Sequence, residues 1–188
     1  MKTALTIAGS DSSGGAGIQA DLKVFTVLGV YGMSAITAVT AQNTLGVKEV
    51  LSIPEEIIAK QIDVTVGDIQ ADATKTGMIG NVLAVEAVAD AIKRNNLQPY
   101  VCDPVMFAKS GDKLLDDDAI ERVKRKLFPL ATVITPNRRE AAGLASGLKL
   151  VDSIDQAKQL VNMAVQYSDG QGRGTSPVNV MAFKPKKK

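Results

Sequence analysis

A glycine-rich segment near the N-terminus constrains the fold of this chain more than any other feature. Between Gly9 and Gly17 the sequence contains four glycines, three serines and one aspartate. An apolar run of strand length precedes the segment, and apolar residues at helical spacing follow it, namely Ile18, Leu22, Phe25 and Leu28. In α/β proteins this order of strand, loop and helix brings backbone N–H groups up to a ligand. A tight turn alone needs fewer glycines, so the pattern favours a binding site.

Two common phosphate-binding motifs match this loop poorly. A P-loop is absent because no Lys-Ser or Lys-Thr pair follows the last glycine. The segment Gly15 to Ala20 satisfies the alanine-ended dinucleotide fingerprint, but the strand ends near Ala8, which leaves a loop too long for the tight turn. The acidic residue of that fingerprint is also missing, since Val39 to Leu45 contain no aspartate or glutamate. A nicotinamide-dependent dehydrogenase is therefore a poor second hypothesis.

Strands and helices alternate along the rest of the chain. Apolar runs predict strands near residues 3–8, 33–40, 47–53, 73–76, 100–103 and 132–135. Helical periodicity predicts helices near residues 18–28, 54–66, 82–94, 116–127, 140–144 and 154–165. We expect Met33 to Ala41 to form one fully buried strand that ends at Gln42. The alternation predicts an α/β fold with a mostly parallel central sheet and helices on both faces, and ligands at the carboxyl ends of its strands.

Composition excludes several classes of protein. The 188 residues are 45% hydrophobic and 22% charged, as in ordinary soluble domains, and no apolar run is long enough to cross a membrane. A single cysteine fits a reducing compartment, so we expect a cytoplasmic location. The absence of histidine excludes histidine general bases, Ser-His-Asp triads and histidine metal ligands. The segment from Ser168 to Lys188 holds five basic residues against one acid, and clustered lysines there are typical of a solvated end and not of a nucleic-acid site.

Four blocks of sequence resemble one known family, the hydroxymethylpyrimidine and phosphomethylpyrimidine kinases of thiamine biosynthesis, which are ribokinase-like enzymes. The blocks are Leu5 to Asp21, Ala38 to Thr44, Lys75 to Met78, and Asp103 to Met106 with Ala108 to Asp112. The resemblance extends from the N-terminus to about Gln159. It implies a ribokinase-like fold, ATP and Mg²⁺ as cofactors, and ATP-dependent phosphorylation of hydroxymethylpyrimidine and its phosphate.

The resemblance assigns the substrate pyrimidine to four residues, Gly9, Asp21, Gln42 and Met78. Gln42 carries an amide that can read the edge of an aminopyrimidine ring, although it could equally be a turn residue. Asp21 would hydrogen-bond the substrate in this family; from the sequence alone it is a solvated acid near a helix N-terminus. Met78 would pack on the ring, whereas a methionine in an apolar context is usually a core residue.

The resemblance places Asp103, Asn137 and Glu140 on the phosphate and nucleotide side of the site. Asp103 and Glu140 would hold Mg²⁺ through water. Asp103 before proline can also simply end a strand, and Asn137 with Glu140 three residues later has the spacing of a helix capping box. Residues 109–112 resemble a mobile loop near the substrate. Cys102 points away from Asp103 by strand alternation and is expected to be a small buried residue.

The resemblance stops before a Gly-Thr-Gly-(Cys/Asp) motif, which supplies the anion hole and the catalytic base of the family. Gly172 to Thr175 share only glycines with it, so no catalytic residue is assigned. We expect residues 1–167 to be the N-terminal part of a kinase domain, truncated at its C-terminus, and residues 168–188 to be a disordered basic tail. The alternative to an impaired kinase is a pyrimidine-binding remnant or pseudokinase, which could still form a homodimer.

Overall fold

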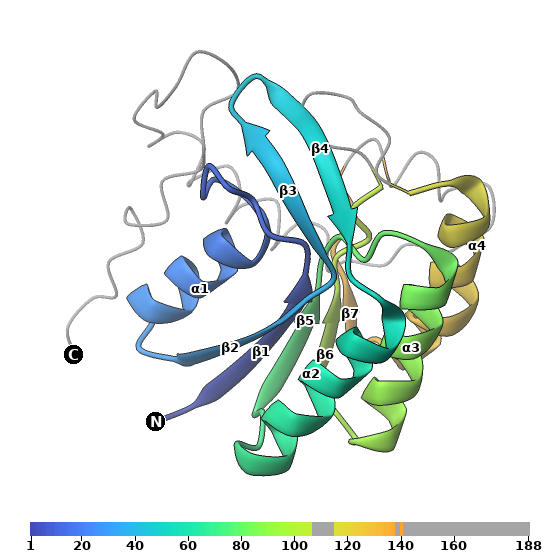
Figure 1. Ribbon diagram of the computed structural model, residues 1–188. Helices are drawn as coiled ribbons and strands as arrows, with labels where there is room; N and C mark the ends of the chain where they lie inside the picture. The colour runs from blue at the N-terminus through green and yellow to red at the C-terminus, as the bar shows by residue number, and fades with distance from the viewer. Residues whose placement is uncertain (107–114, 138–139, 141–188) are drawn as a thin grey trace.

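A parallel sheet forms the centre of the molecule. The computed structural model describes residues 1–106, 115–137 and 140. In that part of the chain the central sheet has five strands in the spatial order β2-β1-β5-β6-β7 (Figure 1). The strands are β1 (Thr3–Ala8), β2 (Tyr31–Ile36), β5 (Ala73–Thr76), β6 (Tyr100–Cys102) and β7 (Val133–Ile134). Every neighbouring pair is parallel, which confirms the predicted α/β class.

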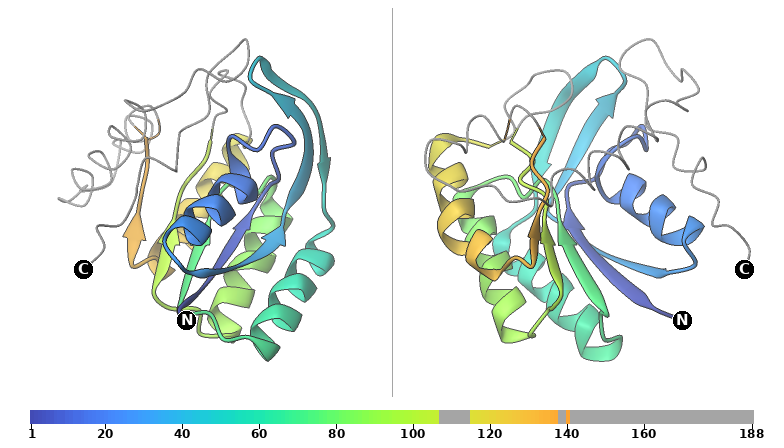
Figure 2. Two further views of the ribbon diagram at one scale, coloured as in Figure 1. Left: turned by 90° about the vertical axis from the view of Figure 1, so that its left-hand side faces the viewer. Right: turned by 180° about the vertical axis from the view of Figure 1, so that it is seen from behind.

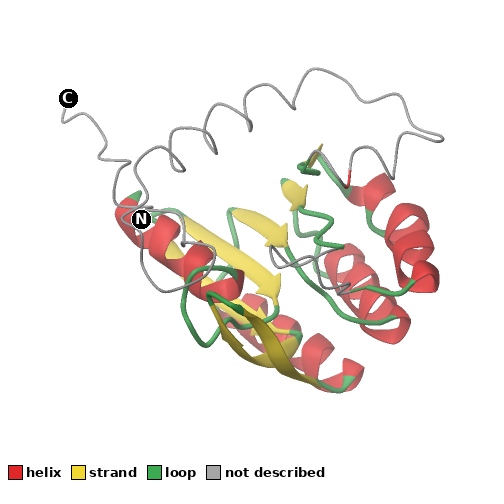
Figure 3. Cartoon of the chain, turned by 90° about the horizontal axis from the view of Figure 1, so that it is seen from above, coloured by secondary structure: helices red, strands yellow, loops and turns green. Residues whose placement is uncertain are grey.

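Helices cover both faces of this sheet (Figures 1 and 3). On one face lies α1 (Gly17–Val27), and on the other lie α2 (Glu55–Asp68), α3 (Val82–Arg94) and α4 (Asp117–Lys126), followed by a short 3₁₀ turn, Phe128–Leu130. Figure 2 shows the same arrangement from two further sides. None of the helices in the described ranges is long and apolar enough to cross a membrane.

The main core lies between the sheet and the helices α2 and α3. Its fully buried members come from both layers, namely Leu5, Ile7, Ile58, Ile62, Val85, Val88 and Ile92. Tyr100 is also buried and shares a hydrogen bond of 2.7 Å with Thr76. Cys102 is buried as predicted, and burial raises the pKa of its thiol to about 11. The thiol therefore stays protonated and unreactive near neutral pH.

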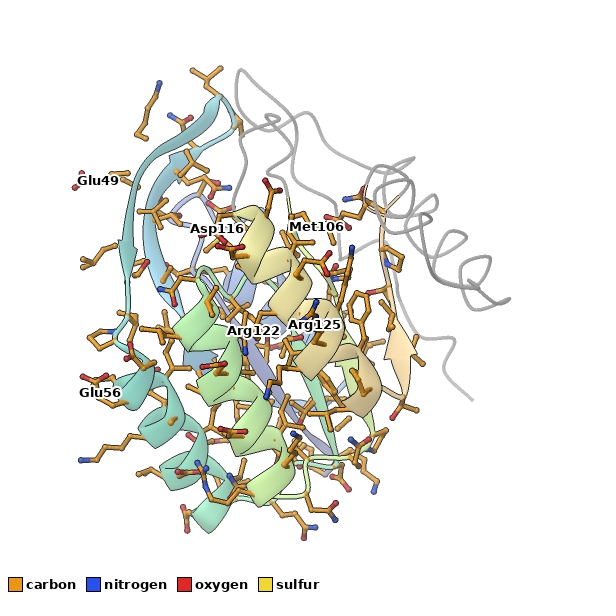
Figure 4. The ribbon with its side chains drawn as sticks, turned by 90° about the vertical axis from the view of Figure 1, so that its right-hand side faces the viewer. Glu49, Glu56, Met106, Asp116, Arg122 and Arg125 are labelled. Carbon is orange, nitrogen blue, oxygen red and sulfur yellow. The ribbon has the colours of Figure 1, made fainter. Side chains whose placement is uncertain are left out.

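Capping residues fix the starts of α3 and α4. The side chain of Asn81 accepts a hydrogen bond of 2.9 Å from the N–H of Ala84. Asp116, labelled in Figure 4, accepts one of 2.7 Å from the N–H of Ala119. Acidic residues occupy the first turn of α4 and basic residues its last turn, a distribution of charge that the helix dipole favours.

The prediction of one buried strand from Met33 to Ala41 is wrong. The chain bends at Thr37 and forms two strands, β2 and β3 (Ala38–Asn43). β3 leaves the central sheet and pairs antiparallel with β4 (Gly46–Ser52), which had been expected in the central sheet. This hairpin projects beyond the carboxyl ends of the central strands (Figure 1).

The chain bends at Thr37 because the neighbouring strand, β1, ends at Ala8. β2 pairs with β1 only as far as Ala8, where the glycine-rich loop begins. Beyond that point the backbone groups of the chain need other partners. Thr37 donates its N–H to Ala8 and its carbonyl accepts from Ile53, while β3 obtains its remaining partners from β4. Buried and exposed residues alternate at the start of β3, as in a sheet with one solvated face.

Candidate functional site

Three chain segments meet at the carboxyl end of β1. The N–H of Gly9 donates to the carbonyl of Met78 at 3.0 Å, and the N–H of Ser10 donates to the carbonyl of Ala38 at 2.8 Å. The hydroxyl of Thr37 also donates to the carbonyl of Met78, at 2.7 Å. The glycine-rich loop, the start of the hairpin and the segment after β5 are therefore joined by hydrogen bonds. This is the edge at which the sequence places the ligand.

Asp11 organises the glycine-rich loop from inside. The residue is 3% exposed, and its carboxylate accepts hydrogen bonds of 2.7 to 3.0 Å from the Ser13 N–H and hydroxyl and from the N–H groups of Gly15 and Ala16. The N–H of Asp11 itself donates to the side chain of Gln19 at 2.8 Å. Asp11 thus satisfies three N–H groups of the loop before α1, which shapes the loop.

Gly17 allows the loop to close on itself. Its φ of +56° lies in the region that favours glycine, and a Cβ here would overlap the carbonyl oxygen of Gly9. That carbonyl accepts a hydrogen bond of 3.0 Å from the N–H of Ile18. The close approach of these two backbone segments explains why glycine is needed at this position.

The predicted pair Gly9 and Met78 lie in direct contact. A Cβ at Gly9 would overlap the methyl carbon of Met78, so that the absence of a side chain makes room for the methionine. Met78 is half-buried and is not part of the main core. Its place beside the loop is consistent with the predicted contact to a flat ring.

Gln42 lies within β3 and does not follow a strand end, which corrects the sequence prediction. A β-bulge separates it from Ala41, and bulges re-aim the side chains beside them. Ser12 joins Gln42 to the glycine-rich loop through two hydrogen bonds. Its hydroxyl donates to the Gln42 carbonyl at 2.7 Å and accepts from the Gln42 N–H at 2.8 Å. The side-chain oxygen of Gln42 accepts a long hydrogen bond of 3.3 Å from Thr40.

Asp21 joins the substrate side of the site to Asp103 through a lysine. Its Oδ2 accepts a hydrogen bond of 2.6 Å from the hydroxyl of Thr6 and one of 3.1 Å from the ammonium of Lys75. The same ammonium lies 3.5 Å from Oδ2 of Asp103. Lys75 was not among the residues predicted from the sequence to form the site. A lysine inside a short central strand was the available signal, because such lysines are seldom buried without a partner.

The surroundings of Lys75 and Asp103 shift the pKa values of these two groups. Burial lowers the pKa of the Lys75 ammonium, but the charges of Asp21 and Asp103 raise it by more, so that the net shift is upward. Burial raises the pKa of the Asp103 carboxyl, and Lys75 opposes this rise only in part. Lys75 is therefore a permanent cation at physiological pH.

Asn137 and Glu140 form the reciprocal bonds of a capping box. The N–H of Asn137 donates to Oε2 of Glu140 at 2.8 Å, and the N–H of Glu140 donates to Oδ1 of Asn137 at 3.0 Å. Oε1 of Glu140 accepts a third bond, of 3.1 Å, from the N–H of Met106. Burial raises the pKa of the Glu140 carboxyl, and these N–H donors offset the rise only in part. Glu140 thereby connects the chain after β6 with the chain after β7.

The carboxylates of Asp103 and Glu140 fit a hydrated magnesium ion better than a directly bound one. No group of three or more histidine, cysteine, aspartate or glutamate side chains suited to a metal occurs among the residues that the structure describes. Both oxygens of Glu140 already accept backbone hydrogen bonds. Each oxygen keeps a lone pair that can accept from a metal-bound water, but the two oxygens are not free to chelate the ion together. Mg²⁺ usually keeps several waters in proteins and binds through one or two carboxylates. Asp103 and Glu140 fit that role.

Several sequence predictions fall on residues outside the described ranges. These are the loop at residues 109–112, the two helices expected near residues 140–144 and 154–165, the domain boundary at residue 167, and the tail at residues 168–188 with its Gly172 to Thr175 segment.

Comparison with known proteins identifies the family. The family model described as phosphomethylpyrimidine kinase matches residues 11–146. The chain belongs to the phosphomethylpyrimidine kinase family. It is 52% identical over 154 residues to the hydroxymethylpyrimidine/phosphomethylpyrimidine kinase of Haemophilus influenzae, which covers 82% of this chain and 57% of that protein. The chain thus spans little more than half the length of this relative.

Solved structures of the family and its neighbours share the fold. The phosphomethylpyrimidine kinase of Clostridium difficile superposes with a TM-score of 0.74 at 41% identity, covering 94% of this chain and 79% of that one. An ADP complex of pyridoxal kinase from Bacillus subtilis superposes with a TM-score of 0.70 at 42% identity, covering 84% of this chain and 60% of that one. The ribokinase-like fold expected from the sequence is thereby confirmed.

Proposed function

We propose that this chain binds hydroxymethylpyrimidine or its phosphate at the carboxyl end of β1 and β5, as part of an ATP-dependent kinase of thiamine biosynthesis. The observation that carries the proposal is the hydrogen-bonded junction of Gly9, Met78 and the hairpin in a member of the phosphomethylpyrimidine kinase family. The junction joins the glycine-rich loop to the segment that carries Gln42. A flat heterocycle needs one apolar contact and a few placed polar groups, and these residues supply both.

Each substrate-side residue has a distinct part in this proposal. Met78 packs on the pyrimidine ring, and Gly9 leaves room for it. The Gln42 amide pairs with the edge of the ring, where it can both donate and accept. Asp21 accepts a hydrogen bond from the substrate.

The phosphate side of the proposed site consists of Asp103, Asn137 and Glu140, which would hold Mg²⁺ through water. When bound, the metal ion would neutralise charge on the phosphates of ATP. Glu140 also holds the chain after β6 in place through Met106, so that Asp103 stays at the end of its strand. The ADP bound to the pyridoxal kinase of Bacillus subtilis supports the use of an adenine nucleotide by this fold.

A second candidate function is the phosphorylation of pyridoxal, another flat heterocycle. Pyridoxal is the alternative substrate to test, because a pyridoxal kinase shares the fold.

Calorimetry and a transfer assay on the 188-residue chain separate these functions. We expect hydroxymethylpyrimidine to bind and NAD not to bind. Phosphate transfer from ATP to hydroxymethylpyrimidine and to pyridoxal is measured in parallel with that of the Haemophilus influenzae kinase. Turnover of hydroxymethylpyrimidine of about one per second, within the range of kinases, would support the kinase activity. Absence of pyrimidine binding would contradict the proposed function itself.

Gln42→Ala should weaken the binding of hydroxymethylpyrimidine about tenfold, because ring atoms that pair with the amide are left without a partner. Glu49→Ala is the matched control, since Glu49 lies on the same hairpin and points outward in Figure 4. Calorimetry of both variants and the parent measures the effect. Equal affinity of the parent and Gln42→Ala would remove Gln42 from the site.

A further inference from the structure

A charged residue occupies a position of the central sheet where apolar residues are usual. Lys75 lies on β5, with β1 on one side and β6 on the other, and pairs in register with Thr6 and Val101. Its side chain is only 27% exposed. A lysine that is this enclosed needs compensating charge, because desolvation of an unpaired ammonium is costly.

The compensation comes from two acids that lie far apart in the sequence. The Lys75 ammonium is 3.1 Å from Oδ2 of Asp21, on α1, and 3.5 Å from Oδ2 of Asp103, directly after β6. Both carboxylates are enclosed, with exposures of 16% and 30%. Asp21 belongs to the substrate side of the proposed site and Asp103 to its phosphate side. One ammonium therefore connects the two sides.

The contacts of Asp21 are unequal between its two oxygens. Oδ2 accepts from both the Thr6 hydroxyl, at 2.6 Å, and the Lys75 ammonium. Oδ1 accepts no hydrogen bond within the described part of the chain. Two donors from neighbouring strands on one oxygen fix the orientation of the carboxylate and leave the other oxygen available.

The ammonium also lies next to the junction that holds Met78. A Cβ at Gly77 would lie 3.0 Å from the Cβ of Ala8 and 3.4 Å from the Lys75 ammonium, so the cation lies beside the segment that leads to Met78. The N–H of Gly77 donates to the carbonyl of Ile7 at 3.0 Å, which fixes this segment against β1. The lysine is thus placed among the residues that carry the substrate side.

We propose that Lys75 is a positioning residue. It holds the Asp21 carboxylate so that Oδ1 faces the substrate. It also keeps Asp21 and Asp103 together where the substrate side of the site meets the phosphate side. This inference rests on the proposed function. Without the ammonium, two enclosed carboxylates would repel each other, and Asp21 would lose one of the two donors that orient it. The substrate would then meet a carboxylate that is not preorganised.

The test is calorimetric titration of hydroxymethylpyrimidine into the full chain and into Lys75→Met, which keeps the length of the side chain and removes its charge. We expect the affinity to fall about ten- to a hundredfold, as for the loss of a hydrogen bond to a charged group. Lys2→Met is the matched control, because Lys2 forms an exposed ion pair of 2.6 Å with Asp72 away from the site. It should leave the affinity unchanged.

Two further variants separate positioning from a merely structural role. Lys75→Arg keeps the positive charge and should recover part of the affinity. Lys75→Met/Asp103→Asn removes one acid together with the lysine, so that no pair of unpaired carboxylates opposes folding. Its affinity for hydroxymethylpyrimidine should remain lower than that of the parent chain. Urea unfolding of every variant shows whether the chain is folded under the conditions of the titration.

The outcomes distinguish this inference from the function on which it rests. A parent chain that binds no hydroxymethylpyrimidine overturns both. A parent that binds, together with a folded Lys75→Met or double variant that binds equally well, overturns only the role of Lys75. A change in the urea midpoint with unchanged affinity also overturns it, because a purely structural ion pair would give that result.

Discussion

Gly17→Ala is expected to lower the affinity for hydroxymethylpyrimidine by about ten- to a hundredfold, the size of effect that loss of a placed hydrogen bond to the ligand can cause. An alanine Cβ at this position overlaps the carbonyl oxygen of Gly9, and neither backbone segment can move without breaking the junction. We also expect a loss of about 2–5 kcal/mol in the free energy of unfolding, from the positive φ and from the overlap. Calorimetry and urea unfolding measure the two effects.

Gly29→Ala is the control for this prediction. Gly29 also has a positive φ, of +71°, but a Cβ there meets nothing within 4 Å. The substitution should therefore cost only about 1–2 kcal/mol of stability, from the backbone conformation alone, and leave substrate affinity unchanged. Equal effects of the two substitutions on binding would show that the approach of Gly17 to Gly9 does not shape the site.

Ile58→Ala should destabilise the fold by about 2–5 kcal/mol, because it removes a large apolar side chain from a close-packed core. Ile58 is 0% exposed and lies between α2 and the sheet. A protein of ordinary marginal stability would lose a large part of its folding free energy by this change. Urea denaturation, monitored by circular dichroism, measures the change in the free energy of unfolding.

Ile57, the residue before Ile58, supplies the matched control for Ile58→Ala. Ile57 has the same side chain, on the same helix, but is 45% exposed. Ile57→Ala should therefore change the free energy of unfolding by no more than about 0.5 kcal/mol. If both substitutions destabilised the chain equally, the burial of α2 described above would be wrong.

Sequence alone determined the parts of this protein that depend on local pattern. The strand β1, the glycine-rich loop and α1 were located because apolar runs, glycines and helical spacing occur within a few residues of one another. The parallel sheet followed from the alternation of strands and helices. The Asn137–Glu140 capping box followed from a three-residue spacing, and its two hydrogen bonds are present in the structure.

The division of the segment around Thr37 was not predictable from its composition. Small and β-branched residues continue through the bend, and nothing local marks the end of β2. The bend arises because β1 ends at Ala8 and offers no further backbone partners, while β4 does. The same change placed Gln42 inside a hairpin strand, beside a bulge. Only the tertiary pairing of strands decides such a feature.

The site was divided in the same way between sequence and structure. Gly9, Asp21, Met78 and Asp103 were predicted as site residues from the resemblance in sequence, but the connection of Asp21 to Asp103 through Lys75 was not predicted. The partners of this lysine come from positions 21 and 103, and no pattern within a short window relates residues so far apart. The register of β5 with β1 and the packing of α1 on the sheet bring both carboxylates within 3.5 Å of the Lys75 ammonium. Long-range contacts of this kind depend on the folded backbone, because electrostatic partners are chosen by distance in space and not along the chain.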